Sequence, residues 1–141
     1  TGIVLGVLQD DRSINLEAVQ RLSERADPLP VTFHKAIDET RDPLQEMKKL
    51  SRIQNIQSIL SSGGAQNAET GAKMLKNMQQ EFQSRFRMIA AGSITSENLL
   101  SLHHKIGFPE YHGRKIVGDL AHHQTRPEIH SNELDNPNSS F

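Results

Sequence analysis

The sequence contains no cysteine and no tryptophan, and it has a single tyrosine. A chain without cysteine forms neither disulfides nor thiolate metal sites, and its composition is compatible with a reducing cytoplasm, where we expect the protein. No apolar run approaches the roughly 20 residues that a membrane-spanning helix needs. No secretory signal pattern opens the chain, and its start at Thr1, directly before an apolar stretch, suggests that something has been removed upstream.

The chain also carries little net charge and few aromatic side chains. The formal net charge is -1 at pH 7, and aromatic residues make up 4% of the chain. Such a chain has neither a positive field that attracts nucleic acid or an anionic membrane nor many rings on which bases stack. We therefore expect no nucleic-acid partner and no membrane partner. The 35% of hydrophobic and 23% of charged residues are typical of one soluble globular domain.

What the sequence does contain is an alternation of apolar, strand-length runs and amphipathic segments. The predicted strands are 2–8, which we expect to be covered on both faces, a run that starts at Val31, and 56–60, 87–91 and 110–117. Helices are predicted after Asn15 and Asp42 and at 67–82 and 96–105. Several of these boundaries carry local signals: Asn15, Asp42 followed by Pro43, and Thr95 are N-cap candidates, and Gly107 suits a left-handed C-terminal position.

Strand–helix repeats of this length predict an α/β fold with a parallel sheet. Two architectures are compatible with them, an open doubly wound sheet and a partial TIM (β/α)8 barrel. A whole barrel needs about 250 residues, so this chain would hold five of its eight strands. We assign 1–120 to this domain and 121–141 to a polar tail or loop that we expect to be partly mobile.

A cluster of titratable side chains follows the apolar run Val31-Thr32-Phe33. His34, Lys35 and Asp38 fall at its carboxyl end, where parallel α/β sheets place their ligands. They are therefore candidate catalytic residues. The competing interpretation is that His34 is a core histidine and that the other two only solvate a loop.

Glycine-bearing turns follow the next strands. Ser61-Ser62-Gly63-Gly64 and Gly92-Ser93 come directly after buried strands, and Gly113 lies in the last strand. Backbone amides left free in such turns bind phosphate or another anion, so these residues are candidate anion ligands. Tight turning and close helix packing explain the same glycines equally well.

Taken together, four motifs resemble the successive signatures of the CutC family of copper homeostasis proteins. They are VTFHKAID at 31–38, ILSSGG at 59–64, IAAGSI at 89–94 with ENL at 97–99, and YHG at 111–113. The resemblance implies a cytoplasmic TIM barrel, of which this chain would hold strands four to eight, linked to copper tolerance. It also implies a homo-oligomer, and we expect association through exposed barrel edges.

The resemblance also suggests site residues. His34, Lys35 and Asp38 match the strand end of the family, Asp11 an acid in an earlier loop, and His112 the histidine of the last strand. Gln9, Arg12 and Gly113 depart from the pattern, since an acid, a glycine and a serine are common there.

Copper is the one cofactor that the resemblance suggests. Cu(I) prefers thiolate and thioether ligands, and the cysteines proposed for some members lie mostly in the part of the barrel that this chain lacks. His34 and His112 are the best metal candidates, because they alone among the histidines lie at predicted strand ends. The methionines Met74 and Met78 are expected to be packing residues on a helix.

Two other functions use the same residues. In an enzyme, His34 with Asp38 or Asp11 would be a base and its orienting partner. Lys35 would bind an anion or, if desolvated, act as a nucleophilic amine, and the glycine turns would hold the phosphate of a small phosphorylated or carboxylated metabolite. A non-catalytic binding module for a small molecule is the third reading. The sequence alone leaves these alternatives open.

Overall fold

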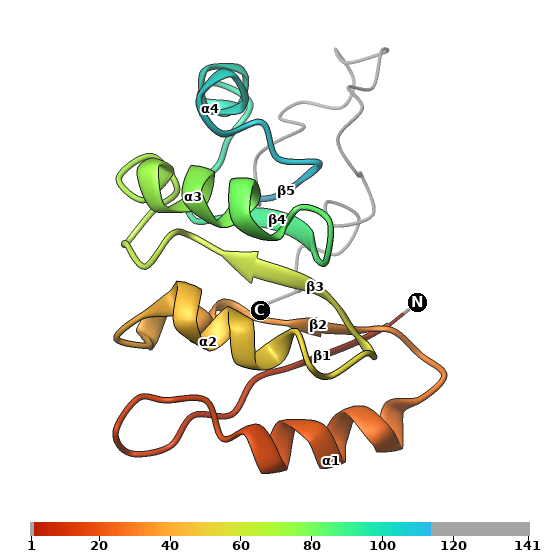
Figure 1. Cartoon of the computed structure of the whole chain (residues 1–141). Coiled ribbons are helices and arrows are strands. Elements are labelled where there is room, and N and C mark those ends of the chain that lie inside the picture. Colours follow the sequence, from red (N-terminus) through yellow and green to blue (C-terminus); the bar gives the residue numbers. More distant parts are fainter. Residues whose placement is uncertain (1, 114–141) are drawn as a thin grey trace.

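The computed structural model describes residues 2–113, which form one parallel sheet with helices against it (Figure 1). The five strands lie in the order β1-β2-β3-β4-β5. They are β1 (Ile3–Leu5), β2 (Val31–Phe33), β3 (Ile56–Ser61), β4 (Arg87–Ala91) and β5 (Glu110–His112). Between them lie α1 (Leu16–Ala26), the 3-10 helix η1 (Lys35–Glu39), α2 (Pro43–Leu50), α3 (Ala72–Phe82) and α4 (Leu99–Ile106).

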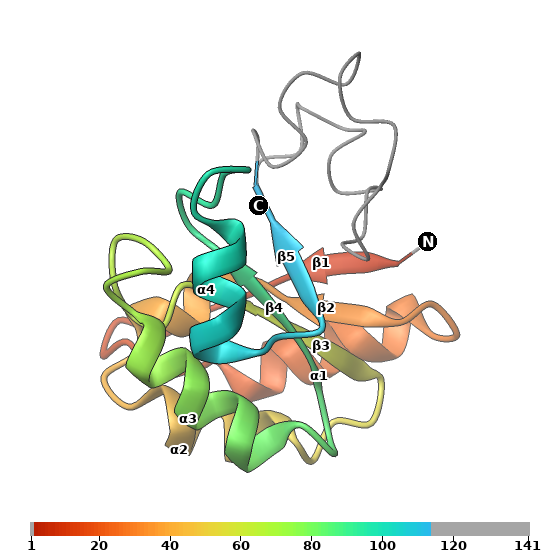
Figure 2. The ribbon, with the colours of Figure 1, turned by 90° about the horizontal axis from the view of Figure 1, so that it is seen from above.

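Each strand pairs in parallel with the strand that follows it in the chain. A doubly wound sheet reverses its strand order at a switch point, whereas a (β/α)8 barrel keeps the sequential order. Figure 2 shows the helices gathered on one side of the strands, as in the outer layer of a barrel. The sheet is therefore part of a barrel, and the doubly wound alternative is wrong.

The main core lies between the sheet and the helices. Phe33, Ile59 and Met88 from adjacent strands are fully buried in it, together with Leu75 and Met78 of α3. Because side chains alternate along a strand, Leu60, Ile89 and Ala91 form a second, small cluster apart from the first. Met78 is thus a core residue and Met74 packs against the core, as predicted.

The first strand differs from its prediction. β1 covers three residues instead of seven, and Ile3 and Val4 are 38% and 37% exposed. The expected cover on both faces is therefore wrong; β1 lies at the end of the described sheet, where β2 is its one described neighbour. Beyond it the chain turns, and the backbone N–H of Asn15 donates to the carbonyl of Val7.

Local signals predicted most helix ends well. Asn15 accepts from the Ala18 N–H and Asp42 from the Gln45 N–H, and Gly107 adopts the left-handed φ of 61°. Two helices begin later than predicted. Residues 67–71 form a turn in which the Asn67 side chain accepts from the Thr70 N–H. Asn98 directly precedes α4, and its side chain accepts from the Thr95 N–H and donates to the Ser93 carbonyl. The predicted cap Thr95 accepts from the N–H groups of Glu97 and Asn98, in the turn before the helix.

At the amino edge of the sheet, Arg85 joins three elements. Its guanidinium donates to the carbonyls of Ser51, Ile53 and Ile56, at 3.0, 2.7 and 2.8 Å, and it lies over the ring of Phe86. One side chain thus holds the whole connection between α2 and β3. Among the described residues no helix is long and apolar enough to cross a membrane.

Candidate functional site

The carboxyl ends of the five strands meet at one edge of the sheet, because all neighbouring strands are parallel. This edge, which we call the mouth, is where the predicted site residues gather. The residues directly after the five strands are Gly6, His34, Ser62, Gly92 and Gly113.

His34 joins the end of β2 to η1. Its backbone N–H donates to the Leu5 carbonyl at 3.1 Å, and its Nδ1 accepts from the backbone N–H of Ala36 at 2.9 Å. The side chain therefore caps η1. Burial lowers the pKa of the half-buried imidazole below its usual 6.5, and the charge of Glu39 partly opposes this shift.

Gly6 lies beside the imidazole of His34. A Cβ atom at this position would lie 2.8 Å from Nε2 and 2.9 Å from Cε1, closer than non-bonded atoms approach. The sequence marked Gly6 only as part of a strand, and no local signal reveals its contact with a residue 28 positions later.

Asp38 is fully engaged by the turn after β3. Its Oδ1 accepts from the Ser61 hydroxyl at 2.5 Å and the Gly64 N–H at 2.9 Å, while Oδ2 accepts from the Ser62 N–H at 2.8 Å and its hydroxyl at 3.0 Å. No described residue links this carboxylate to His34. The predicted pairing of His34 as base with Asp38 as orienter is therefore wrong in this structure; the Ala36 N–H orients the ring instead.

The turn at Ser61–Gly64 does not offer free amides. Besides the bonds of Ser62 and Gly64 to Asp38, the Gly63 N–H donates to the Ser61 hydroxyl at 2.9 Å. The expectation of unoccupied amides is wrong here, because a side chain from η1 already fills the position of an anion. Ser61 and Ser62 are fully buried.

The glycines of these turns have structural reasons. Gly63 and Gly64 adopt φ of 77° and 75°, and a side chain on Gly63 would collide with the carbonyl of Gly71 at the start of α3. Gly92, with φ of 108°, lies against Ser62, where a Cβ would come within 3.0 Å of the Ser62 Cβ. Ser93 is exposed and left-handed at φ 56°, and its carbonyl accepts from Asn98.

Asp11 belongs to a separate turn. It is exposed, and hydrogen bonds from the hydroxyl and N–H of Ser13, at 2.6 and 2.9 Å, lower the pKa of its carboxyl. It forms no bond to His34, so the alternative orienting partner is also absent. Arg12 adopts φ 69°, a conformation that favours glycine, which agrees with its place as a departure from the family pattern.

Two further predicted residues lie at the mouth. Lys35 opens η1, is half-buried, and forms no hydrogen bond or ion pair with any described residue. His112 is 9% exposed and pairs in register with Ala91 of β4. Gly113 follows it as the last described residue; the predicted strand end 114–117 and the tail 121–141 lie outside the described residues.

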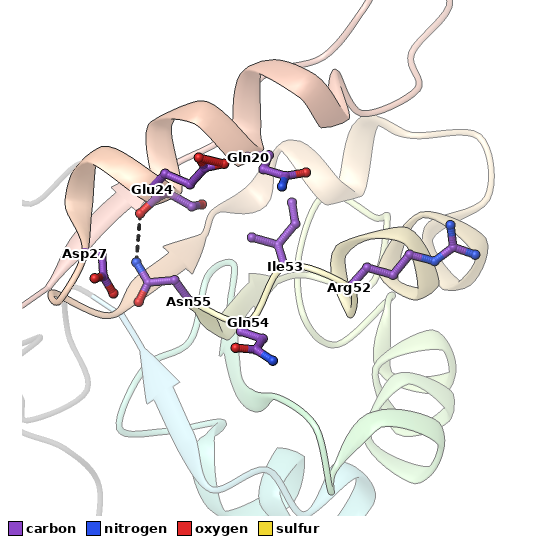
Figure 3. Close-up of a pocket in the computed structure, with 8 residues that line it drawn as sticks. Gln20, Glu24, Asp27, Arg52, Ile53, Gln54 and Asn55 are labelled. Atoms are coloured by element: carbon purple, nitrogen blue, oxygen red, sulfur yellow. Dashed lines mark hydrogen bonds between the residues drawn. The ribbon is translucent and has the colours of Figure 1, made fainter.

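Residues 2–113 contain no group of three or more His, Cys, Asp or Glu side chains that could hold a metal ion. The structure also has a pocket of about 520 Å³ at the opposite, amino edge of the sheet (Figure 3). It is lined by polar side chains at the end of α1 and before β3, among them Glu24, Asp27 and Arg52. None of the predicted site residues lines it.

The CutC family profile matches residues 1–117. The chain belongs to the CutC family. It is 32% identical over 141 residues to a CutC family protein of Vibrio atlanticus, covering 95% of this chain and 56% of the relative. It is 32% identical over 111 residues to the human copper homeostasis protein cutC homolog, covering 79% and 40%.

A crystal structure of CutC from Streptococcus agalactiae superposes on this chain with a TM-score of 0.74 at 26% identity. The match covers 80% of this chain and 55% of the other. The chain thus spans about half the length of the relatives it matches. The predicted family and the predicted partial barrel are both confirmed.

Proposed function

We propose that the mouth of this CutC-family chain binds a small anionic ligand, and that this binding serves copper homeostasis, the role named for the human relative. The observation that carries the proposal is Lys35, a partly buried residue just after the end of β2, whose side chain forms no hydrogen bond or ion pair with any described residue. An ammonium without a partner is stabilised by an opposite charge, so a carboxylate or phosphate fits here. The neighbouring imidazole of His34 adds a polar contact.

The side chains at the mouth suit direct copper binding by His34 and His112 less well than they suit anion binding. The chain has no cysteine, and Met47, Met78 and Met88 are fully buried in the core, so they serve packing. Two histidines alone are a weak set for Cu(I), which favours sulfur ligands. Catalysis is also less well supported than binding, because Asp38 and Asp11 are both engaged elsewhere.

Calorimetric titration of the purified chain with inorganic phosphate and with citrate tests this function. We expect saturable binding that weakens at least tenfold in Lys35→Met and stays unchanged in Lys73→Met, which removes an exposed lysine of α3. The proposal is overturned if neither phosphate nor citrate binds. A competition with a Cu(I) chelator tests the copper alternative: copper taken up by the wild type but not by a His34→Ala, His112→Ala double variant would replace our proposal.

A further inference from the structure

The two ring nitrogens of His34 have different surroundings. Nδ1 accepts a hydrogen bond from the Ala36 N–H at 2.9 Å, so it carries a lone pair and no proton. A neutral imidazole has one ring proton, which must then be on Nε2. Burial of the ring favours the neutral form at neutral pH, because desolvation lowers the pKa of His34.

Glycine at position 6 leaves the Nε2 edge of this ring uncovered. A methyl group there would lie 2.8 Å from Nε2 and 3.2 Å from the Ala36 Cβ. Alanine at position 6 would thus push the ring away from its bond with Ala36 or cover the nitrogen that bears the proton. Nε2 itself has no hydrogen-bond partner among the described residues.

We propose that His34 is held as an Nε2–H hydrogen-bond donor for an oxygen atom of the ligand, and that Gly6 keeps this donor accessible. Because the proposed function places this donor beside the cation of Lys35, the ligand class is a carboxylate or phosphate. For the ligand, this inference rests on the proposed function, whereas the position of the ring proton is independent of it.

The same geometry opposes the predicted use of His34 as a metal ligand. A metal at Nε2 needs the lone pair of that nitrogen, which moves the ring proton to Nδ1. There it would face the Ala36 N–H at hydrogen-bond distance, and two donors would oppose each other. Nδ1 is already occupied by that N–H, so neither nitrogen suits a metal while the cap of η1 is intact.

Nitrogen-15 NMR of the chain labelled at histidine tests the proton position, with the His34 signals assigned by their loss in His34→Asn. We expect a protonated Nε2 and an unprotonated Nδ1 at pH 7.5, and no change of these signals with one equivalent of Zn²⁺ or Cu(I). A proton on Nδ1, a doubly protonated ring at this pH, or a metal-induced shift of Nε2 would each overturn the assignment.

Three variants then distinguish the donor role of His34 Nε2 from the role of Nδ1 in capping η1. His34→Asn keeps an acceptor for the Ala36 N–H but lacks Nε2, whereas His34→Gln places an amide N–H near the Nε2 position and loses the ring acceptor. We expect phosphate affinity to fall at least tenfold in His34→Asn and Gly6→Ala, and less than threefold in His34→Gln. Equal loss in Asn and Gln, or full affinity in Asn, contradicts the donor role.

A wild-type chain that binds neither phosphate nor citrate refutes the proposed function and the role of His34 toward a ligand together. The NMR result distinguishes the two failures. If Nε2 carries the proton while anions do not bind, only the ligand is wrong; if Nδ1 carries it while phosphate binds through Lys35, only the His34 assignment is wrong.

Discussion

The carboxylate of Asp38 accepts both the backbone N–H and the hydroxyl of Ser62, at 2.8 and 3.0 Å. With the bonds from Ser61 and Gly64 it fastens η1 to the turn after β3. We expect Asp38→Ala to lower the free energy of unfolding by about 2–4 kcal/mol, because several partly buried donors lose a charged acceptor. Urea denaturation followed by circular dichroism measures this.

Asp42→Ala is the matched control for that change. Asp42 is exposed and caps α2 through one bond to the Gln45 N–H, at 3.2 Å. Its loss should cost about 1 kcal/mol. Equal effects of the two substitutions would show that the Asp38 contacts contribute no more to stability than a single exposed helix cap.

The cap formed by His34 should make stability depend on pH. The folded pKa of His34 lies below 6.5, so the unfolded state takes up the proton first as the pH falls. Its stabilising contribution is therefore complete above pH 6.5 and is lost as the pH drops through the folded pKa. We expect urea midpoints of the wild type to fall between pH 7.5 and 5.5 more than those of His34→Asn; parallel curves would contradict this.

Tyr111 is the only tyrosine of the chain, and it is buried. Its hydroxyl accepts from the Phe108 N–H at 3.1 Å and lies 2.5 Å from Nδ1 of His103, and burial raises the pKa of Tyr111 to about 12. Absorbance of the phenolate, with no tryptophan to interfere, should therefore rise near pH 12 instead of 10. A midpoint near 10 in the folded chain would refute it.

The same shift predicts a loss of stability in alkali. An unfolded tyrosine ionises near pH 10, whereas the folded one holds its proton longer, so stability falls as the pH rises from 10 towards 12.

Arg85 should not be replaceable by lysine. One ammonium cannot reach three carbonyls that the planar guanidinium reaches at 2.7–3.0 Å. We expect Arg85→Lys to lower the free energy of unfolding by about 2 kcal/mol in thermal or urea denaturation. Arg52→Lys, at an exposed position of the same connection, should change it by less than about 0.5 kcal/mol. Similar losses of unfolding free energy in both variants would refute a stabilising role of the three Arg85 hydrogen bonds.

The strand β1, which ends the sheet within the described residues, should make the chain self-associate. An edge with apolar side chains such as Ile3 and Val4 is a template for pairing with another chain. We expect light scattering after size-exclusion chromatography to show association that decreases in Val4→Lys. Leu100→Lys, at a position 67% exposed on α4 and away from the edge, should leave it unchanged. A wild-type monomer at all concentrations would contradict the expectation.

Several elements were predictable because their causes are local. The caps of Asn15 and Asp42 and the left-handed Gly107 lie within four residues of the groups they serve, and the strand–helix alternation follows from apolar periodicity. The late starts of α3 and α4 were not predictable in this way. There, Asn67 and Asn98 bind nearby backbone groups and stabilise turns where apolar spacing and, for α4, the Thr95 cap predicted helix.

By itself, the sequence determined the order of strands and helices, the family, and the residues that come to the mouth, since strand ends of a parallel sheet share one edge. Only the tertiary structure decided what those residues do there. The donors that bind Asp38 lie 23 to 26 residues away in the chain. Gly6 contacts His34 because the two residues directly follow the neighbouring strands β1 and β2. Such contacts depend on the pairing of strands, which places the Asp38 carboxylate on the turn after β3 and the His34 side chain beside Gly6 as the cap of η1.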